Sequence, residues 1–216
     1  MSAVPVFKIR DKVSALTHFT ALVAAIFAMP ALLIHAAANG ADKTALISLS
    51  VFMLSMVFLY AASTAYHSFQ LSDRGLRRLK KLDHIMIFFL IAGTYTPVCI
   101  TALHNLKLLY FVWALALLGT VFKLCYVTCP KWLSSVIYIA MGWSCLSAMP
   151  EIMASLSRAG FLWLLCGGLA YTIGGIIYAI KPRLLKERLF GPHEIFHLFV
   201  MAGSLCHYVF MYFHMV

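Results

Sequence analysis

The sequence predicts an all-α polytopic membrane protein, built as a seven-transmembrane-helix bundle. Hydrophobic residues make up 63% of the 216 positions and charged residues only 11%, whereas soluble domains carry about 25% charged residues. Seven apolar runs of roughly 20 residues follow one another, and each is long enough to cross a hydrocarbon core of about 30 Å. This composition excludes an ordinary soluble domain.

The seven runs define the predicted helices, and short connections separate them. No long polar segment remains to form a soluble domain, so we expect a single membrane domain over residues 1–216. The helices are predicted near residues 14–38, 45–69, 83–104, 107–127, 132–150, 159–180 and 192–214.

The first helix has one alternative interpretation, a cleaved signal peptide. Lys8, Arg10 and Lys12 precede its apolar run, and small residues close it at 36–38. However, the run from 13 to 38 exceeds the roughly 7–15 residues of a signal-peptide apolar region. We therefore assign it as the first transmembrane helix.

Prolines and glycines predict where the helices bend, end and pack. Pro30 and Pro97 should bend the first and third helices, because a proline removes a backbone donor and clashes with the preceding turn. Helix ends are predicted at Pro130, Pro150, Pro182 and Pro192. Small residues on the sixth helix should allow close approach of a neighbour, and these are Gly167, Gly168, Gly174 and Gly175.

The net charge of +10 is explained by membrane topology. If the N-terminus is cytoplasmic, only Lys43, Lys107 and Arg158 of the 17 Lys and Arg residues fall outside. This asymmetry follows the positive-inside rule and places the C-terminus outside. The cytoplasmic residues are Lys8, Arg10, Lys12, Arg74, Arg77, Arg78, Lys80, Lys81, Lys123, Lys131, Lys181, Arg183, Lys186 and Arg188. We expect them to meet anionic lipid headgroups, and we expect no nucleic-acid partner.

The seventh helix opens on His193-Glu194-Ile195-Phe196-His197. Positions i and i+4 share a helix face with Cβ atoms about 5–6 Å apart, so two imidazoles at this spacing can bind one metal ion. HExxH on a helix is a zinc-binding pattern, and ionisable side chains at membrane depth are costly and usually functional. The alternative is a helix start whose histidines only meet headgroups. We favour the metal site.

The predicted topology brings polar residues of three helices to the cytoplasmic leaflet. The second helix ends at His67, the third begins at Asp83, and the seventh begins at His193. An inverted helix would place its group about 30 Å away. Catalytic zinc commonly takes three protein ligands and leaves a fourth position for water. His67, His193 and His197 would form such a set.

Asp83 and Ser63 are the candidate catalytic residues. Asp83 would supply the carboxylate that three neutral imidazoles lack, and would orient or deprotonate the water. Ser63 lies one turn from His67, about 6 Å deeper, where its hydroxyl could donate to a developing oxyanion. The alternatives are a carboxylate favoured by the helix dipole for Asp83 and a bond to its own helix carbonyl for Ser63.

The other polar residues of the seventh helix leave two interpretations open. Glu194 is either the general base of a zincin-type protease or an acidic residue favoured in a first helical turn. His207 lies about 15 Å beyond His197, too far to complete a zincin site, so we expect it to hydrogen-bond a neighbouring helix. Elsewhere, we expect His18 to support the metal ligands and His84 to lie at the membrane interface.

Taken together, these residues resemble the hemolysin III family, part of a larger group that contains progestin and adipoQ receptors and alkaline ceramidases. The resemblance covers almost the whole chain in the family's order. Its segments are residues 11–18 (DKVSALTH), 63–67 (STAYH), 82–97 (LDH, then AGTYTP) and 191–207 (GPHE, His197, GS and His207). Asp11 stands where glutamate is expected in many members.

The resemblance implies a seven-helix fold with a cytoplasmic N-terminus, in the bacterial plasma membrane. It implies a zinc ion (Zn²⁺) held by His67, His193 and His197, with Asp83 and Ser63 beside it. It also implies hydrolysis of a lipid amide or ester in membrane-lipid homeostasis, with membrane lipids and an acyl-lipid substrate as partners.

Two alternatives to a hydrolase stay open. One is a non-catalytic lipid sensor or receptor-like protein in which zinc is structural and joins the second and seventh helices. The other is a pore-forming cytolysin, as the family name implies, although the charged groups cluster at one face and line no path. The sequence predicts neither the substrate nor an oligomeric state.

Overall fold

A computed structural model describes residues 9–182 and 190–215 of the chain. Seven of its helical spans are long and apolar enough to cross a membrane, and the described residues include no strand. This confirms the predicted fold class, while the orientation across the membrane stays a prediction. Some residues assigned above to the cytoplasmic side lie outside the described ranges, namely Lys8, Arg183, Lys186 and Arg188.

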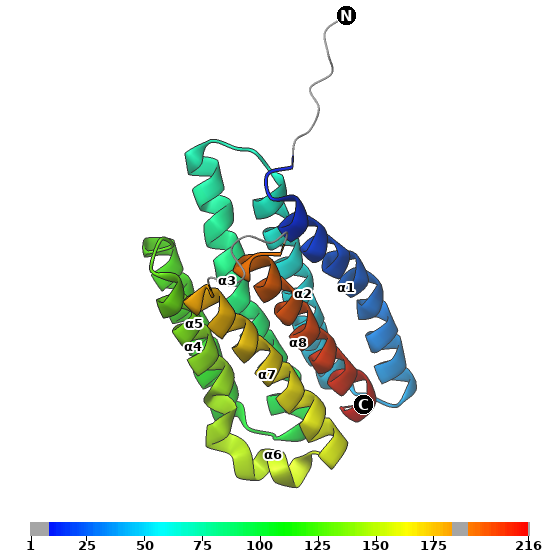
Figure 1. The fold of residues 1–216 in the computed structure, drawn as a ribbon. Helices are drawn as coiled ribbons and strands as arrows, with labels where there is room; N and C mark the ends of the chain where they lie inside the picture. The colour runs from blue at the N-terminus through cyan, green and yellow to red at the C-terminus, as the bar shows by residue number, and fades with distance from the viewer. Residues whose placement is uncertain (1–8, 183–189, 216) are drawn as a thin grey trace, which may run out of the picture.

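The long helices run alongside one another (Figure 1). They are α1 (Lys12–Ala38), α2 (Lys43–Ser68), α3 (Asp73–Pro97), α4 (Leu106–Cys125), α5 (Lys131–Gly142), α7 (Arg158–Ile180) and α8 (Pro192–His214). The π-helix η1 (Val98–Ala102) continues α3. The 3₁₀ segment η2 (Trp143–Ala148) and the short α6 (Met149–Ser155) continue α5, so that the fifth span is Lys131–Ser155.

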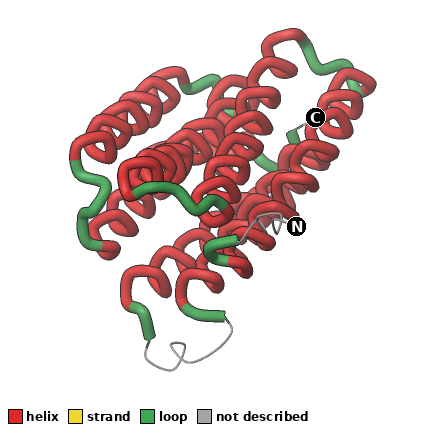
Figure 2. Tube along the Cα trace, turned by 90° about the horizontal axis from the view of Figure 1, so that it is seen from above, coloured by secondary structure: helices red, strands yellow, loops and turns green. Residues whose placement is uncertain are grey.

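The first and last helices of the chain pack against each other. α1 packs against α2 and α8, α2 also packs against α3, and α7 packs against α5 and α8. α4 packs mainly against α3, and the view from above in Figure 2 shows the described helices gathered into one bundle. On the outer face of α4, Leu117, Leu118 and Val121 are 58%, 67% and 58% exposed. Large apolar side chains exposed to this degree fit a lipid environment, because soluble monomers rarely expose such patches.

The third helix begins ten residues before its predicted start. Ser72 caps it by accepting a hydrogen bond from the backbone of Gly75. Its first ten residues carry five basic side chains, so the apolar run that guided the prediction does not include them. α3 therefore projects a cationic extension from the end of the bundle at which the chain begins (Figure 1).

Pro97 and Pro150 lie where the helix geometry changes. Pro97 is the last residue of α3, and the π-helix η1 begins immediately after it, while the predicted bends at Pro30 and Pro97 stay predictions. The predicted helix end at Pro150 is wrong. Pro150 lies in the first turn of α6, where a missing N–H needs no acceptor, so the fifth span continues to Ser155.

Glycines let α7 approach α8 closely. A Cβ atom added at Gly167 would lie 2.3 Å from the ring of His207, and one added at Gly174 would lie 2.7 Å from the Cβ of Phe199. A Cβ added at Gly168 would meet nothing within 4 Å. The predicted packing role therefore holds for Gly167 and Gly174 but not for Gly168.

We expect Gly167→Ala to lower the free energy of unfolding by about 1–3 kcal/mol, because the new methyl group overlaps a packed ring. Gly168→Ala is the matched control, since it makes the same change one residue away where space is open. Alanine is favoured over glycine in helices by about 1 kcal/mol, so the control should be at least as stable as the parent. Thermal unfolding in detergent micelles compares them, and equal stability of the two variants would contradict the close packing.

Candidate metal centre

Three histidines from α2 and α8 meet at the end of the bundle where the chain begins. His67 lies on the last turn of α2, while His193 and His197 lie on the first turns of α8. One ring nitrogen of each lies within 4.8 Å of the other two, and the Nε2 atoms of His67 and His193 are 3.2 Å apart. Ligands of tetrahedral zinc at about 2.0–2.1 Å lie about 3.3 Å from one another. This histidine triad can therefore hold a metal ion.

Asp11 orients the first histidine of the triad. The chain just before α1 folds back onto the end of α2, where the backbone N–H of Asp11 donates to the carbonyl of His67 over 2.9 Å. The Nδ1 of His67 donates in turn to the Asp11 carboxylate over 3.0 Å. A proton fixed on Nδ1 leaves the lone pair of Nε2 free to bind a metal. Nε2 is the atom that faces His193.

The carboxylate of Asp11 is held ionised by its surroundings. Partial burial raises its pKa, but the hydrogen bonds from His67 and Arg10 and the positive charge of Arg10 outweigh this effect. The pKa of Asp11 therefore lies below its ordinary value. The side chains of Arg10 and Asp11 form an ion pair at 3.0 Å. A permanent negative charge beside His67 partly compensates the charge of a bound cation.

The third histidine is held by α1. The ring of His18 stacks on that of His197, with centroids 3.7 Å apart and planes 8° apart. The hydroxyl of Thr17 donates to the carbonyl of Ser14, and its oxygen lies 3.4 Å from the Nδ1 of His197. Because that hydroxyl hydrogen is already used, Nδ1 is the donor of this contact, and the Nε2 of His197 stays available as a ligand.

Sequence reasoning gave no role at the metal centre to Asp11, Ser14 or Thr17. Ser14, Thr17 and His18 lie at helical spacing on one face of an otherwise apolar helix, which is the signal that could have found the two hydroxyl residues. His18 was expected near the metal ligands and lies there, as a stacking neighbour of His197. Ser14 donates to the carboxylate of Glu194 over 3.0 Å, so Glu194 links the first turn of α8 to α1.

Asp83 and Ser63 lie together on α3 and α2, one beside the other. Both are buried, at 8% and 1% exposure, and the Ser63 hydroxyl lies close to the Asp83 carboxylate. The Ser63 oxygen nevertheless has no hydrogen-bond partner among the described residues. Asp11, rather than Asp83, is the carboxylate bonded to a histidine of the triad. Asp83 faces the cavity that adjoins the triad.

This cavity runs from the triad into the bundle. Its wall includes Ser63, Asp83, His193 and His197 at one end and reaches Val98 and Trp143 further along. About 22 Å of helix separates Asp83 from Val98. The cavity volume is about 180 Å³, more than ten times the roughly 10–15 Å³ that one water needs. We call it the apolar cavity, because most of its lining residues are hydrophobic.

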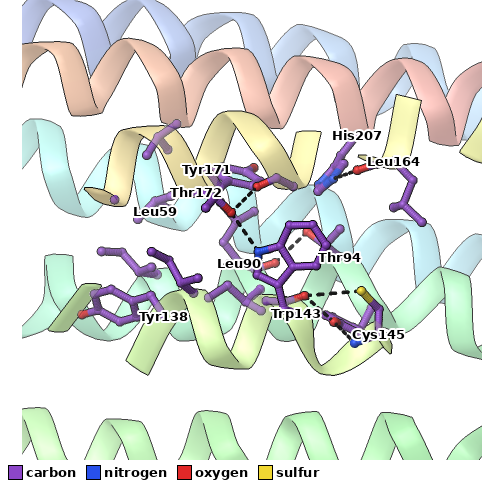
Figure 3. A pocket seen from close by; sticks show the side chains of 18 of the residues that line it. Leu59, Leu90, Thr94, Tyr138, Trp143, Cys145, Leu164, Tyr171, Thr172 and His207 are labelled. Carbon is purple, nitrogen blue, oxygen red and sulfur yellow. Dashed lines mark hydrogen bonds between the residues drawn. The ribbon is translucent and has the colours of Figure 1, made fainter. Parts of the chain in front are cut away.

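The polar side chains deeper in the apolar cavity are bonded to protein (Figure 3). The Nε1 of Trp143 donates to the Thr172 hydroxyl over 2.9 Å. The Nε2 of His207 donates to the carbonyl of Leu164 over 3.2 Å, which confirms the predicted bond of His207 to a neighbouring helix. The Nδ1 of His207 has no partner among the described residues. Because the other polar groups named here have partners and most of the lining is hydrophobic, the space favours an apolar occupant over water.

The placement of His84 differs from the sequence expectation. It was predicted at the membrane interface, but it lines the apolar cavity, and its Nδ1 is buried without a hydrogen-bond partner among the described residues. The ten-residue extension of α3 explains the difference. His84 lies well inside that helix rather than at its beginning.

The chain matches the family described as "Haemolysin-III related" over residues 8–208. The chain belongs to the hemolysin III family. It is 38% identical over 202 residues to the "Hemolysin-3 homolog" of Bacillus subtilis (strain 168), covering 92% of this chain and 91% of the relative. With "Hemolysin-3" of Bacillus cereus the identity is 36% over 194 residues, covering 88% and 85%.

A more distant relative extends the comparison beyond bacteria. The "Adiponectin receptor protein" of Drosophila melanogaster is 26% identical over 187 residues, covering 73% of this chain and 40% of the relative. These matches confirm the resemblance to the hemolysin III family and its relation to adipoQ receptors. With the seven spans, they identify a multi-pass membrane protein.

In this hemolysin III protein, all four segments that carried the resemblance reach the site. Residues 11–18 support the histidines, residues 63–67 supply Ser63 and His67, residues 82–97 supply Asp83, and residues 191–207 supply His193 and His197. The meeting of the triad is a structural observation. The identity of the metal and the catalytic roles of Asp83 and Ser63 stay predictions.

Proposed function

We propose that this protein is a zinc-dependent hydrolase of an acyl-lipid amide or ester, acting in membrane-lipid homeostasis. The observation that carries the proposal is the position of the histidine triad at one end of the apolar cavity, with Asp83 and Ser63 on the adjoining wall. Such a site would place a polar reacting group beside the triad and an acyl chain within the bundle.

The histidine donors fit zinc. Three imidazoles are a common ligand set of catalytic zinc, which keeps one position for water or substrate. His67, His193 and His197 would hold the ion, and Asp11 would keep His67 in the tautomer that binds through Nε2. Bound zinc would supply Lewis acidity toward a carbonyl and would make water a nucleophile near neutral pH.

The protein's own residues would then perform the proton transfers and orient the substrate. A carboxylate oxygen of Asp83 would take the proton from the attacking water and return it to the leaving nitrogen or oxygen. The Ser63 hydroxyl would donate a hydrogen bond to the carbonyl oxygen as negative charge develops there. The walls of the apolar cavity would bind the acyl chain and exclude bulk water from the reacting bond.

A direct assay tests this proposal. Purified protein in micelles is given N-acyl and O-acyl lipids, and released fatty acid is measured before chelation, after chelation and after zinc is restored. We expect release that chelation abolishes and zinc restores. Absence of release from every lipid tested by zinc-loaded protein would overturn the proposal.

One observation also favours a non-catalytic sensor with structural zinc. The triad joins the last turn of α2 to the first turns of α8, which is where a metal would hold two helices together. In that case zinc-loaded protein would bind acyl lipids without cleaving them. The Asp83 variant in the Discussion separates this candidate from the hydrolase.

A further inference from the structure

A second, surface pocket lies near the histidine triad, between α2, the basic extension of α3 and the connection from α4 to α5. Its wall carries three cationic side chains, Arg10, Arg77 and Lys80, and one carboxylate, Asp73. Tyr66 and Thr128 add two hydroxyl groups. We call it the basic pocket.

Two cations of the basic pocket, Arg77 and Lys80, are available to a ligand. Within the described part of the chain, neither Arg77 nor Lys80 forms a side-chain hydrogen bond or an ion pair, although Asp73 lines the same pocket. Arg10 pairs with Asp11, and its guanidinium carbon lies 4.2 Å from the centre of the Tyr66 ring. The Arg10 side chain is therefore fixed at the pocket wall.

The charge and chemistry of the pocket suit a phosphate group. Three cations and one carboxylate line the pocket, and Asp11, which pairs with Arg10, adds a second negative charge, so the net charge is about +1. A phosphate monoester carries about −1.5 to −2 near pH 7. Guanidinium groups bind phosphate oxygens through paired N–H donors, and lysine binds phosphate as a point charge. Hydroxyl groups such as those of Tyr66 and Thr128 can donate to the remaining oxygens.

The basic pocket continues the line of the apolar cavity. Ser63 and Asp83 line the cavity, whereas Tyr66 and Lys80 line the basic pocket. Tyr66 follows Ser63 by three residues on α2, and Lys80 precedes Asp83 by three residues on α3. Three residues of helix span about 4.5 Å along the axis. Both steps lead toward the end of the bundle where the chain begins. One amphiphile could therefore reach from the cavity, past the triad, into the basic pocket.

We propose that the basic pocket binds the phosphate group of the substrate lipid, so that the substrate class is an acyl lipid with an anionic phosphate headgroup. This inference rests on the proposed function for the position of the acyl chain. The phosphate occupies the basic pocket, the acyl carbonyl lies beside the histidine triad, and the chain enters the apolar cavity. A short linker between phosphate and acyl group matches the one-turn separation of the two sites.

Lipid binding in micelles tests the proposal without requiring turnover. The two probes are a single-chain lysophosphatidic acid and the monoacylglycerol with the same chain, which lacks the phosphate. We expect the parent protein to bind the phosphate lipid at least about tenfold more tightly, as for a pair of charge-assisted contacts. The double variant Arg77→Gln/Lys80→Gln should lose this preference and still bind the monoacylglycerol.

The matched control is Arg74→Gln/Arg78→Gln, which removes two positive charges from the same stretch of α3 outside the pocket. It should keep the preference. Equal loss in both double variants would overturn the proposal, because it reduces the effect to general surface charge. No preference in the parent would also overturn it, because the pocket then does not recognise the phosphate group. Displacement of the phosphate lipid by inorganic phosphate at equal concentration would overturn the lipid assignment and give the pocket to free phosphate.

Failure of this inference is distinguishable from failure of the proposed function. A phosphate preference without release of fatty acid from any lipid supports the basic pocket and rejects the hydrolase. Release of fatty acid with no preference for phosphate lipids does the reverse.

Discussion

Asp83→Asn is expected to lower acyl-lipid hydrolysis by about 10²–10⁴-fold while the protein keeps its metal. Asparagine has nearly the same shape as aspartate, but its side chain cannot accept and return a proton, and general acid–base catalysis contributes about this factor. Asp83 makes no hydrogen bond to a histidine of the triad, so metal binding should not depend on it. Fatty-acid release and metal content are measured on the same preparation.

Glu151→Gln is the control for this variant, because it neutralises an exposed carboxylate of α6 that lines neither the apolar cavity nor the basic pocket. It should leave hydrolysis within about twofold of the parent, a change of only about 0.4 kcal/mol. Unchanged turnover in Asp83→Asn would remove Asp83 from the mechanism. If the parent itself binds acyl lipid and zinc without turnover, the structural-zinc sensor becomes the better account.

His197→Ala is expected to abolish both turnover and the stabilisation of the protein by zinc. A ligand that binds only the folded state stabilises it by about 2.7 kcal/mol at one hundred times its dissociation constant. Two remaining imidazoles bind far more weakly than three, so added zinc should raise the melting temperature of the parent and not that of the variant. His197 is 1% exposed, so the variant should also melt lower than the parent without zinc, because it leaves a cavity.

His104→Asn is the control for that experiment. His104 is exposed, lies in the turn before α4, and has a φ of 48°, a conformation that asparagine tolerates well. Its response to zinc should equal that of the parent. A zinc-induced rise in melting temperature that survives in His197→Ala would show that the ion binds elsewhere.

The fold was predictable because membrane insertion imposes one simple rule. Apolar runs of roughly 20 residues had to be helices, since backbone groups in lipid need internal partners, and seven spans are observed. The rule detects only apolar runs, so it missed the polar helical segment that forms the first ten residues of α3. It also ended the fifth span at Pro150, although a proline is equally suited to begin a helix there.

The site was predictable to the extent that topology decides it. Alternation of the spans was enough to bring His67 and the His193–His197 pair to the same end of the bundle, where the structure places them together. Topology does not say which carboxylate bonds a histidine. Asp11 reaches His67 because the chain before α1 folds back onto α2, and this tertiary contact leaves no periodic signal in the sequence.

Elemental analysis of the purified protein tests the central claim most directly. With His67, His193 and His197 as a joint ligand set, the parent should contain about one zinc per chain, and His197→Ala should contain less than about a tenth of that. A parent protein free of transition metal, or a variant that retains as much zinc as the parent, would contradict the account.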